Sequence, residues 1–190
     1  MRKSREGEIK KTISLPLDKV ILKGTELVVS SKDNERDAGI LILLGVYTGL
    51  RKTDLLNLKP SQFVVQDNQY CVVGVASKTG KEYNIPIKKY IYDLVVSNST
   101  LPDTILSKQR SGMFLNRWIE RQFPIEKARA LRTKRTISCH SLRKTFGLHI
   151  FNKFGINSAR EALQHSSIAT TTLYLEIEAK NLREQLASAF

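Results

Sequence analysis

Residues 40–56 read ILILLGVYTGLRKTDLL, and this stretch determines most of what can be predicted about the fold. Its first half is almost entirely apolar, which predicts a buried helix. Ser31 or Asp33 is suited to cap the start of that helix, and Gly49 is suited to end it. Because Arg51 follows almost at once, the sequence predicts an arginine at the point where a buried helix stops.

Downstream of this stretch the pattern changes from helix to strand and back to helix. A second short helix is predicted over 53–58. Valine-rich segments bounded by polar residues predict three strands, over 62–65, 69–76 and 82–87, with Lys78-Thr79-Gly80 as a hairpin turn. Helical spacing predicts the remaining helices, over 88–96, 113–123, 141–154, 158–163, 170–175 and 179–189. The predicted fold class is α+β, mainly α-helical, with a small three-stranded antiparallel sheet.

The chain is strongly basic. Its formal net charge is +13, and residues 108–144 carry eleven Lys or Arg against two Glu, a local charge of +9. Such a concentration suits a polyanion, of which DNA is the usual one, although a solvated basic surface is the simpler alternative. The candidate phosphate contacts in this segment are Arg117, Arg121, Arg132, Lys134, Arg135 and Lys144.

Composition also bounds the class of protein and its compartment. A hydrophobic content of 41% excludes a disordered chain, and 190 residues are about the size of one domain. The two cysteines, Cys71 and Cys139, give neither a disulfide framework nor a paired metal-ligand spacing, which favours a reducing compartment. The sequence shows no signal-peptide core and no apolar run of membrane-spanning length. We therefore expect a cytoplasmic protein without membrane association.

Four separated segments contain side chains suited to phosphate chemistry. They supply two arginines, one lysine, two histidines and one tyrosine: Arg51, Arg143, Lys78, His140, His165 and Tyr174. Taken singly, each residue has a structural explanation that is at least as good, such as a surface arginine, a lysine in a hairpin turn or a tyrosine in the core. Taken together, they form a complete set for covalent cleavage of a phosphodiester.

This set requires no further chemical group. Two guanidinium groups hold the non-bridging oxygens of a phosphodiester and stabilise the charge of its transition state. A tyrosine attacks phosphorus while a histidine takes its proton, and a lysine protonates the departing alkoxide. Carboxylate clusters of the kind that hold magnesium are missing from the sequence, so we expect neither a metal nor a cofactor.

In order and spacing, these motifs resemble those of the tyrosine recombinases, the phage integrase family. The family's first motif is Thr-Gly-x-Arg followed by an acid and a leucine, which corresponds to Thr48, Gly49, Arg51, Asp54 and Leu55. The second motif is His-x-x-Arg, found here at 140–143. The third is Leu-Gly-His-Ser-Ser with the nucleophilic tyrosine nine residues after the histidine, which corresponds to 163–167 and Tyr174. The resemblance covers roughly residues 35–176.

The resemblance implies a role for each of the six residues. The two arginines clamp the scissile phosphate, and Lys78 acts as general acid toward the 5′-oxygen. The two histidines hydrogen-bond the phosphate, with His140 the better candidate to take the tyrosine proton. Tyr174 forms a 3′-phosphotyrosyl bond, which a 5′-hydroxyl of a partner strand then attacks. The implied function is site-specific recombination, namely integration, excision or inversion of DNA, as in mobile genetic elements.

The resemblance also implies an organisation and partners. It divides the chain into a lead-in or linker (1–30), a catalytic domain (31–176) and a C-terminal helix or tail (177–190). The implied partners are double-stranded DNA and further copies of the chain, a tetramer on DNA, and the implied source is a bacterium, an archaeon or a phage. Two positions depart from the family pattern. Gln164 replaces the usual glycine of the third motif, and Lys144 stands where histidine or arginine is frequent.

Several alternatives stay open at the level of sequence. A type IB topoisomerase uses the same groups to relax DNA, and a non-catalytic DNA-binding module needs only the basic segment. Family members usually carry an N-terminal DNA-binding domain, so this chain is either part of a longer protein or a compact recombinase similar to the fimbrial-inversion enzymes. The tail over 177–190 either docks onto a neighbouring protomer or packs against its own domain.

Overall fold

The structure, a computed structural model, describes residues 11–98 and 101–176. These residues form two compact units, the first ending at Phe146 and the second beginning at Gly147. The boundary lies within helix α7 (Cys139–Ala162), whose helical geometry is interrupted at Gly155, where φ is 82°. The predicted helix over 179–189 and the tail over 177–190 lie outside the described residues.

The elements of the first unit confirm the predicted fold class, which is mainly helical with a small three-stranded antiparallel sheet. In chain order they are α1 (Leu17–Val28), α2 (Asp33–Thr48), α3 (Lys52–Leu56), the 3₁₀ turn η1 (Pro60–Gln62), β1 (Phe63–Gln66), β2 (Gln69–Val75), β3 (Glu82–Ile87), α4 (Lys89–Asn98), α5 (Gly112–Gln122), α6 (Pro124–Arg132) and the start of α7. The second unit contains the rest of α7 and α8 (Ile168–Leu175).

Helix α2 is the centre of the first unit. It is buried along almost its whole length from Asp37 to Thr48, as expected for a helix that is apolar on every side. Its N-cap position is Lys32, which makes no side-chain capping bond, so neither Ser31 nor Asp33 caps the helix as predicted. Its C-cap is Gly49 in the left-handed conformation, as the sequence predicts.

Within the lead-in or linker expected over residues 1–30, residues 17–28 form helix α1, which the sequence prediction did not include. The buried residues of α1 are spaced four apart, at Val20, Gly24 and Val28, so a single narrow stripe packs against α2. The two backbones approach closely, because a Cβ added at Gly39 of α2 would lie 2.5 Å from the backbone nitrogen of Val28. The apolar positions of α1 recur at helical spacing along its length, so the pattern is present in the sequence and the prediction missed it.

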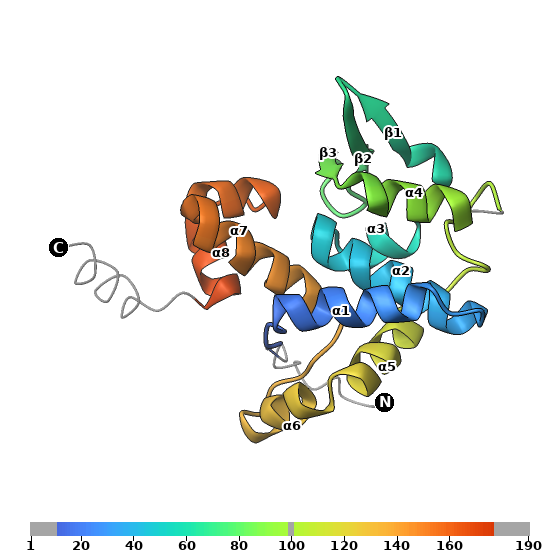
Figure 1. The fold of residues 1–190 in the computed structure, drawn as a ribbon. Coiled ribbons are helices and arrows are strands. Elements are labelled where there is room, and N and C mark those ends of the chain that lie inside the picture. Colours follow the sequence, from blue (N-terminus) through green and yellow to red (C-terminus); the bar gives the residue numbers. More distant parts are fainter. Residues whose placement is uncertain (1–10, 99–100, 177–190) are drawn as a thin grey trace, which may run out of the picture. The chain divides into compact units, whose positions relative to one another are not determined.

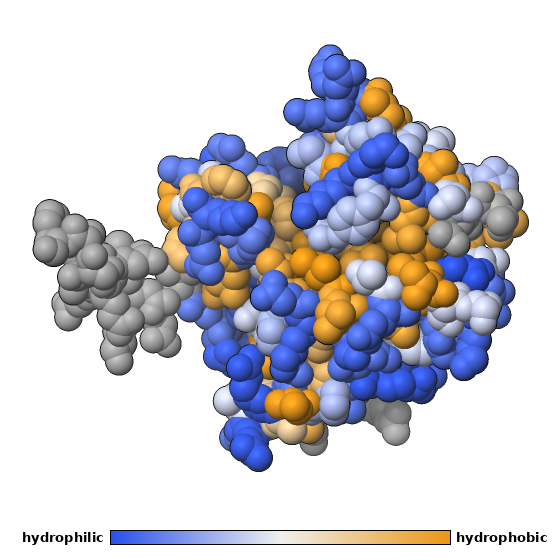
Figure 2. Space-filling view, in the orientation of Figure 1, coloured by the Kyte–Doolittle hydropathy of each residue, from blue (hydrophilic) through white to orange (hydrophobic). Residues whose placement is uncertain are grey.

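The sheet has the order β1-β2-β3, and both pairs are antiparallel. Within the first unit, the sheet and α4 lie on one side of the α1–α2 pair, and α5 and α6 lie on the other side (Figure 1). Figure 2 shows apolar side chains gathered between α1 and α4, whereas around α6 hydrophilic side chains surround a smaller apolar patch.

Helix α6 is absent from the sequence prediction. Its only buried residues are Glu126 and Ala130, so it has no apolar stripe that a periodicity search would find. None of the helices in the described part of the chain has the length and apolar character needed to cross a membrane.

Candidate active site

The two arginine motifs are joined directly. Arg143, in the first turns of α7, is 6% exposed, and its Nη1 donates to the backbone carbonyl of Gly49. That carbonyl belongs to the sharp turn between α2 and α3, in which Leu50 N–H donates to Thr48 Oγ1 at 3.3 Å. Arg51 is the N-cap residue of α3, directly after this turn. The Thr-Gly-x-Arg motif therefore forms the turn onto which the second arginine is anchored.

A second tie joins α3 to the hairpin turn that carries the predicted lysine. Asp54 of α3 is 6% exposed, and its Oδ1 accepts hydrogen bonds from Ser77 N–H at 2.9 Å and from Ser77 Oγ at 2.5 Å. The turn itself is closed by Gly80 N–H, which donates to the Ala76 carbonyl at 2.8 Å. Lys78 is exposed in this turn. Asp54, the acidic residue of the first motif, thus holds Ser77, which precedes the predicted general acid Lys78.

His140 occupies the second position of α7. Its side chain keeps an exposed surface, while Cys139 Sγ lies 3.7 Å from its Nδ1. The surrounding protein desolvates the imidazole and so lowers the pKa of His140 below its ordinary value of 6.5, and the charges of Lys52 and Arg143 lower this pKa further. His140 is therefore neutral at pH 7, the state in which an imidazole can accept a proton.

The second unit holds the other two predicted residues together. The rings of His165 and Tyr174 meet edge to face, with centroids 5.2 Å apart. Tyr174 lies near the end of α8, and His165 Nδ1 is 3.1 Å from Oγ1 of the fully buried Thr171 in the same helix. Thr171 Oγ1 in turn donates to the Ser167 carbonyl at 3.2 Å. Thr171 thus fixes His165 at the start of the helix that carries the tyrosine.

Gln164, which stands where the family has a glycine, keeps the backbone conformation that favours glycine. Gln164 adopts a φ of 51°, in the left-handed region that favours glycine. Its N–H donates to the Glu161 carbonyl at 2.8 Å, and His165 N–H donates to the Arg160 carbonyl at 2.9 Å, which closes the end of α7. The backbone of the third motif therefore keeps its helix-ending turn although the residue is a glutamine.

The predicted DNA contacts fall into two groups. Arg117, Arg121, Arg132 and Lys134 are exposed and Arg135 is half-buried. Lys144 is different, because it is 4% exposed and its Nζ donates to the Thr12 carbonyl at 3.1 Å. Without DNA this ammonium group fixes the N-terminal segment from inside the protein, and a contact of Lys144 with DNA stays a prediction.

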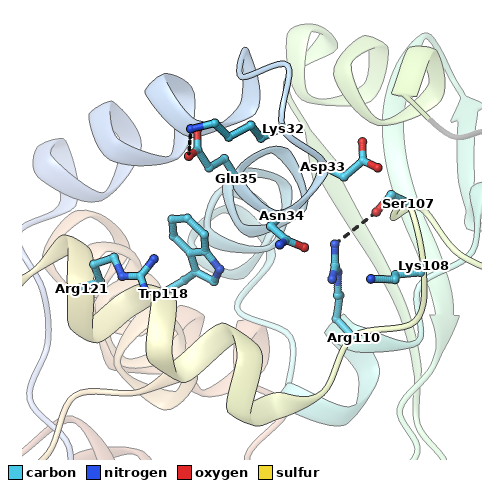
Figure 3. Close-up of a pocket in the computed structure, with 9 residues that line it drawn as sticks. All are labelled: Lys32, Asp33, Asn34, Glu35, Ser107, Lys108, Arg110, Trp118 and Arg121. Atoms are coloured by element: carbon cyan, nitrogen blue, oxygen red, sulfur yellow. Dashed lines mark hydrogen bonds and ion pairs between the residues drawn. The ribbon is translucent and has the colours of Figure 1, made fainter.

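A pocket of about 540 Å³ lies between the first turn of α2, the segment 107–110 and α5 (Figure 3). At the edge of the pocket, the guanidinium carbon of Arg121 lies 4.9 Å from the centre of the Trp118 ring. The buried Arg110 forms an ion pair with Asp37, with 2.6 Å between Nη2 and Oδ2. The 16 residues of α2, about 24 Å of helix, separate this pocket from the turn at Gly49. The described residues that line it include none of the six predicted catalytic residues.

The structure thus connects the segments of four predicted residues in the first unit, namely Arg51, Lys78, His140 and Arg143, and pairs His165 with Tyr174 in the second. The sequence did not predict the residues that hold these six in place. They are Ser77, Thr171, Cys139 and Asn116 of α5. Only Asp54 gave a signal, as the acid of the first motif. The others contact residues that periodicity and motif order do not bring together.

Comparisons with known proteins agree with this arrangement. The model of the phage integrase family matches residues 21–181. The chain is 32% identical to the tyrosine recombinase XerC of Bradyrhizobium diazoefficiens over 163 residues, which are 81% of this chain and 50% of that protein. It is 28% identical to the tyrosine recombinase XerA of Pyrococcus horikoshii, over 85% of this chain and 58% of that protein. The chain therefore spans about half the length of the curated relatives it matches.

Solved structures show the same fold. The site-specific recombinase XerH bound to its difH substrate, in a pre-cleavage complex, superposes with a TM-score of 0.69 at 19% identity, over 98% of this chain and 56% of that one. The catalytic domain of bacteriophage HP1 integrase superposes with a TM-score of 0.58 at 19% identity, over 93% of this chain and 95% of that domain. With its three motifs in order on this fold, the chain belongs to the phage integrase family of tyrosine recombinases.

Proposed function

We propose that this chain performs site-specific recombination of double-stranded DNA by cleaving and rejoining one strand at a time through a 3′-phosphotyrosyl intermediate. The observation that carries the proposal is the hydrogen bond from Arg143 to the Gly49 carbonyl. It joins the two motifs whose arginines must act on one phosphate.

The proposed steps follow from the residues. Oη of Tyr174 attacks the scissile phosphorus, and His140 takes the phenolic proton, for which its lowered pKa keeps it unprotonated at pH 7. Arg51 and Arg143 neutralise the charge that develops on the non-bridging oxygens. The bond from phosphorus to the 5′-oxygen breaks, and Lys78 donates a proton to that oxygen. The 5′-hydroxyl of a partner strand reverses these steps and releases the tyrosine.

His165 has a supporting role in this proposal. With Nδ1 on Thr171, its ring is oriented beside Tyr174, so it hydrogen-bonds the same phosphate. The DNA partner is supported by the XerH relative, whose structure contains its substrate DNA. A homo-oligomer, a tetramer on DNA, is part of the proposal, because strand exchange joins ends that are cut by different protomers.

Covalent capture tests the nucleophile. Duplexes with a nick close to each candidate cleavage position are tiled across the DNA flanking the gene, and SDS-resistant protein–DNA adducts are scored. We expect adducts with the wild type and none with Tyr174→Phe, which should bind DNA with nearly unchanged affinity. Tyr92→Phe on α4 is the matched control, because it removes the same oxygen from a helix that carries none of the six residues.

Three outcomes would count against the proposal. Adducts formed equally by Tyr174→Phe would remove the tyrosine from the chemistry. A wild type that binds the duplexes but never forms an adduct would favour a non-catalytic DNA-binding module. Catalytic relaxation of any supercoiled plasmid, without preference for one site, would favour a type IB topoisomerase.

A further inference from the structure

The start of α7, which carries His140, is held by a residue of another helix. Cys139 N–H donates to Oδ1 of Asn116, on α5, at 2.9 Å. The amides of the first turn of a helix have no acceptor within the helix, so Asn116 satisfies one that would otherwise be unpaired in a part-buried position. His140 N–H is held separately by Ser138 Oγ at 3.2 Å. The place of His140 therefore depends on α5 as well as on α7.

The ring of His140 is held by its neighbour in the chain. Cys139 is 6% exposed, and its Sγ lies 3.7 Å from Nδ1 of His140. Burial raises the pKa of the Cys139 thiol, so the sulfur is protonated at neutral pH. In a neutral imidazole one nitrogen is a donor and the other an acceptor, and the partner of one nitrogen sets the role of the other. A neutral sulfur thus lies beside Nδ1.

We propose that Asn116 and Cys139 are positioning residues for His140. Asn116 fixes the backbone at the start of α7, and Cys139 occupies Nδ1, so that Nε2 is the nitrogen that acts on the DNA. When Nδ1–H points to the sulfur, Nε2 carries the lone pair that accepts the Tyr174 proton. This inference rests on the proposed function for its effect on activity, but its effect on the histidine is measurable in the protein alone.

The charged groups around His140 fit this assignment. Lys52 of α3 and Arg143 of α7 face it, and Asn116 and the Cys139 thiol are both uncharged. The side chain of Lys52 packs across the start of α5, because a Cβ added at Gly112 would lie 2.6 Å from Lys52 Cδ. The charges of these two cations disfavour the imidazolium, in the same direction as desolvation.

The first test measures His140 without DNA. The chain has three histidines, so long-range ¹H–¹⁵N spectra of the imidazoles recorded against pH resolve each pKa and each tautomer. Replacing Cys139 by alanine lets water reach Nδ1, and we expect the pKa of His140 to rise toward 6.5. Cys139→Ser retains a polar group beside Nδ1 and should keep most of the wild-type behaviour. Cys71→Ala is the matched control, because it removes the same buried sulfur from β2.

The second test measures covalent adduct formation against pH. We expect Cys139→Ala and Asn116→Ala to slow the reaction by about 10- to 100-fold, the range seen when groups that orient metal-bound histidines are removed. Their DNA affinity should not change. In Cys139→Ala the acidic limb of the pH profile should move to higher pH. Asn116→Asp keeps an acceptor for the Cys139 amide and should recover most of the rate at pH 8, where His140 is neutral.

The two tests separate the possible failures. If Cys139→Ala leaves the pKa, the tautomer and the adduct rate as in the wild type, the positioning role is wrong while the recombinase function stands. If the wild type forms no adduct but Cys139→Ala still shifts the His140 pKa, the proposed function fails and the contact stands. A loss of stability alone, shared by Cys139→Ala and Cys71→Ala without any shift at His140, would show that Cys139 is only a core residue.

Discussion

Gly49 is subject to two constraints at once. Its φ of 61° lies in the left-handed region, and a Cβ at this position would lie 2.2 Å from Cδ1 of Phe146. The first constraint alone costs an L-residue about 1–2 kcal/mol, and overpacking against a buried ring adds about 1–3 kcal/mol. We expect Gly49→Ala to lower the free energy of unfolding by about 2–5 kcal/mol, measured by chemical denaturation. The same change displaces the carbonyl that Arg143 binds, so adduct formation should also fail.

Gly80 provides the matched control within the chain. Its φ is 65°, close to that of Gly49, but a Cβ added there meets no atom within 4 Å among the described residues. Gly80→Ala should therefore lower the free energy of unfolding only by the cost of the left-handed backbone conformation, about 1–2 kcal/mol. Equal losses of unfolding free energy in the two variants would mean that a small movement relieves the overlap with Phe146, so that this overlap does not destabilise Gly49→Ala.

Gln164 and Lys144 show what a family pattern can and cannot predict for a single residue. A glycine motif indicates a backbone conformation, and Gln164 adopts that conformation without the glycine. A charge count indicates a binding surface, but Lys144 turns its ammonium to a backbone carbonyl inside the protein. Backbone demands are visible in sequence, whereas the direction of a long side chain is decided by what packs around it.

Hydrogen bonds connect α3, which follows the proposed phosphate clamp Arg51, to the β2–β3 turn, which carries the proposed general acid Lys78. Asp54 Oδ1 accepts both the N–H and the hydroxyl of Ser77, the residue before Lys78. If the turn is held in place by these bonds, Ser77→Ala and Asp54→Asn should slow strand cleavage by about 10-fold, a part of the 10²- to 10⁴-fold that a general acid contributes. The measurement is the rate of adduct formation on a nicked duplex.

A sulfur substitution separates positioning of Lys78 from general damage. With a 5′-sulfur at the scissile position the leaving group is a thiolate, which departs without protonation. Ser77→Ala should then cleave this DNA at nearly the wild-type rate. Arg51→Gln is the matched control, since a missing phosphate clamp should not be rescued by sulfur. Failure of the sulfur to rescue Ser77→Ala would mean that the tie does not act through Lys78.

At this scale, most helices and strands with strong periodic patterns could be predicted from the sequence, and a helix held by packing alone could not. The apolar run of α2 and the three valine-rich strands are each determined by local pattern. Helix α1 also has an amphipathic pattern, which the sequence prediction missed, whereas α6 buries only two residues and has no local pattern of comparable strength. The positioning residues of the site could not be predicted from local pattern either, because the contact between Asn116 and Cys139 joins residues that are 23 apart in the chain.

For the molecule as a whole, positive charge is the property that distinguishes this chain, with a net charge of +13. Each phosphate neutralised on duplex DNA contributes about −0.9 to the slope of log K against log salt, because counterions are released. A basic surface that contacts DNA therefore differs from a solvated basic surface in one measurable quantity. The end of α6 and the residues after it provide the test, since three of the predicted contacts lie there.

We expect the triple variant Arg132→Gln, Lys134→Gln and Arg135→Gln to weaken DNA binding and to reduce the salt slope by about 2–3, as expected for three lost phosphate contacts. Lys144→Met is the matched control, because it removes a charge that is 4% exposed and bound to the Thr12 carbonyl. It should lower stability and leave the slope unchanged. An unchanged slope in the triple variant would place these residues outside the DNA interface, whereas a reduced slope in Lys144→Met would mean that this lysine is released from Thr12 when DNA binds.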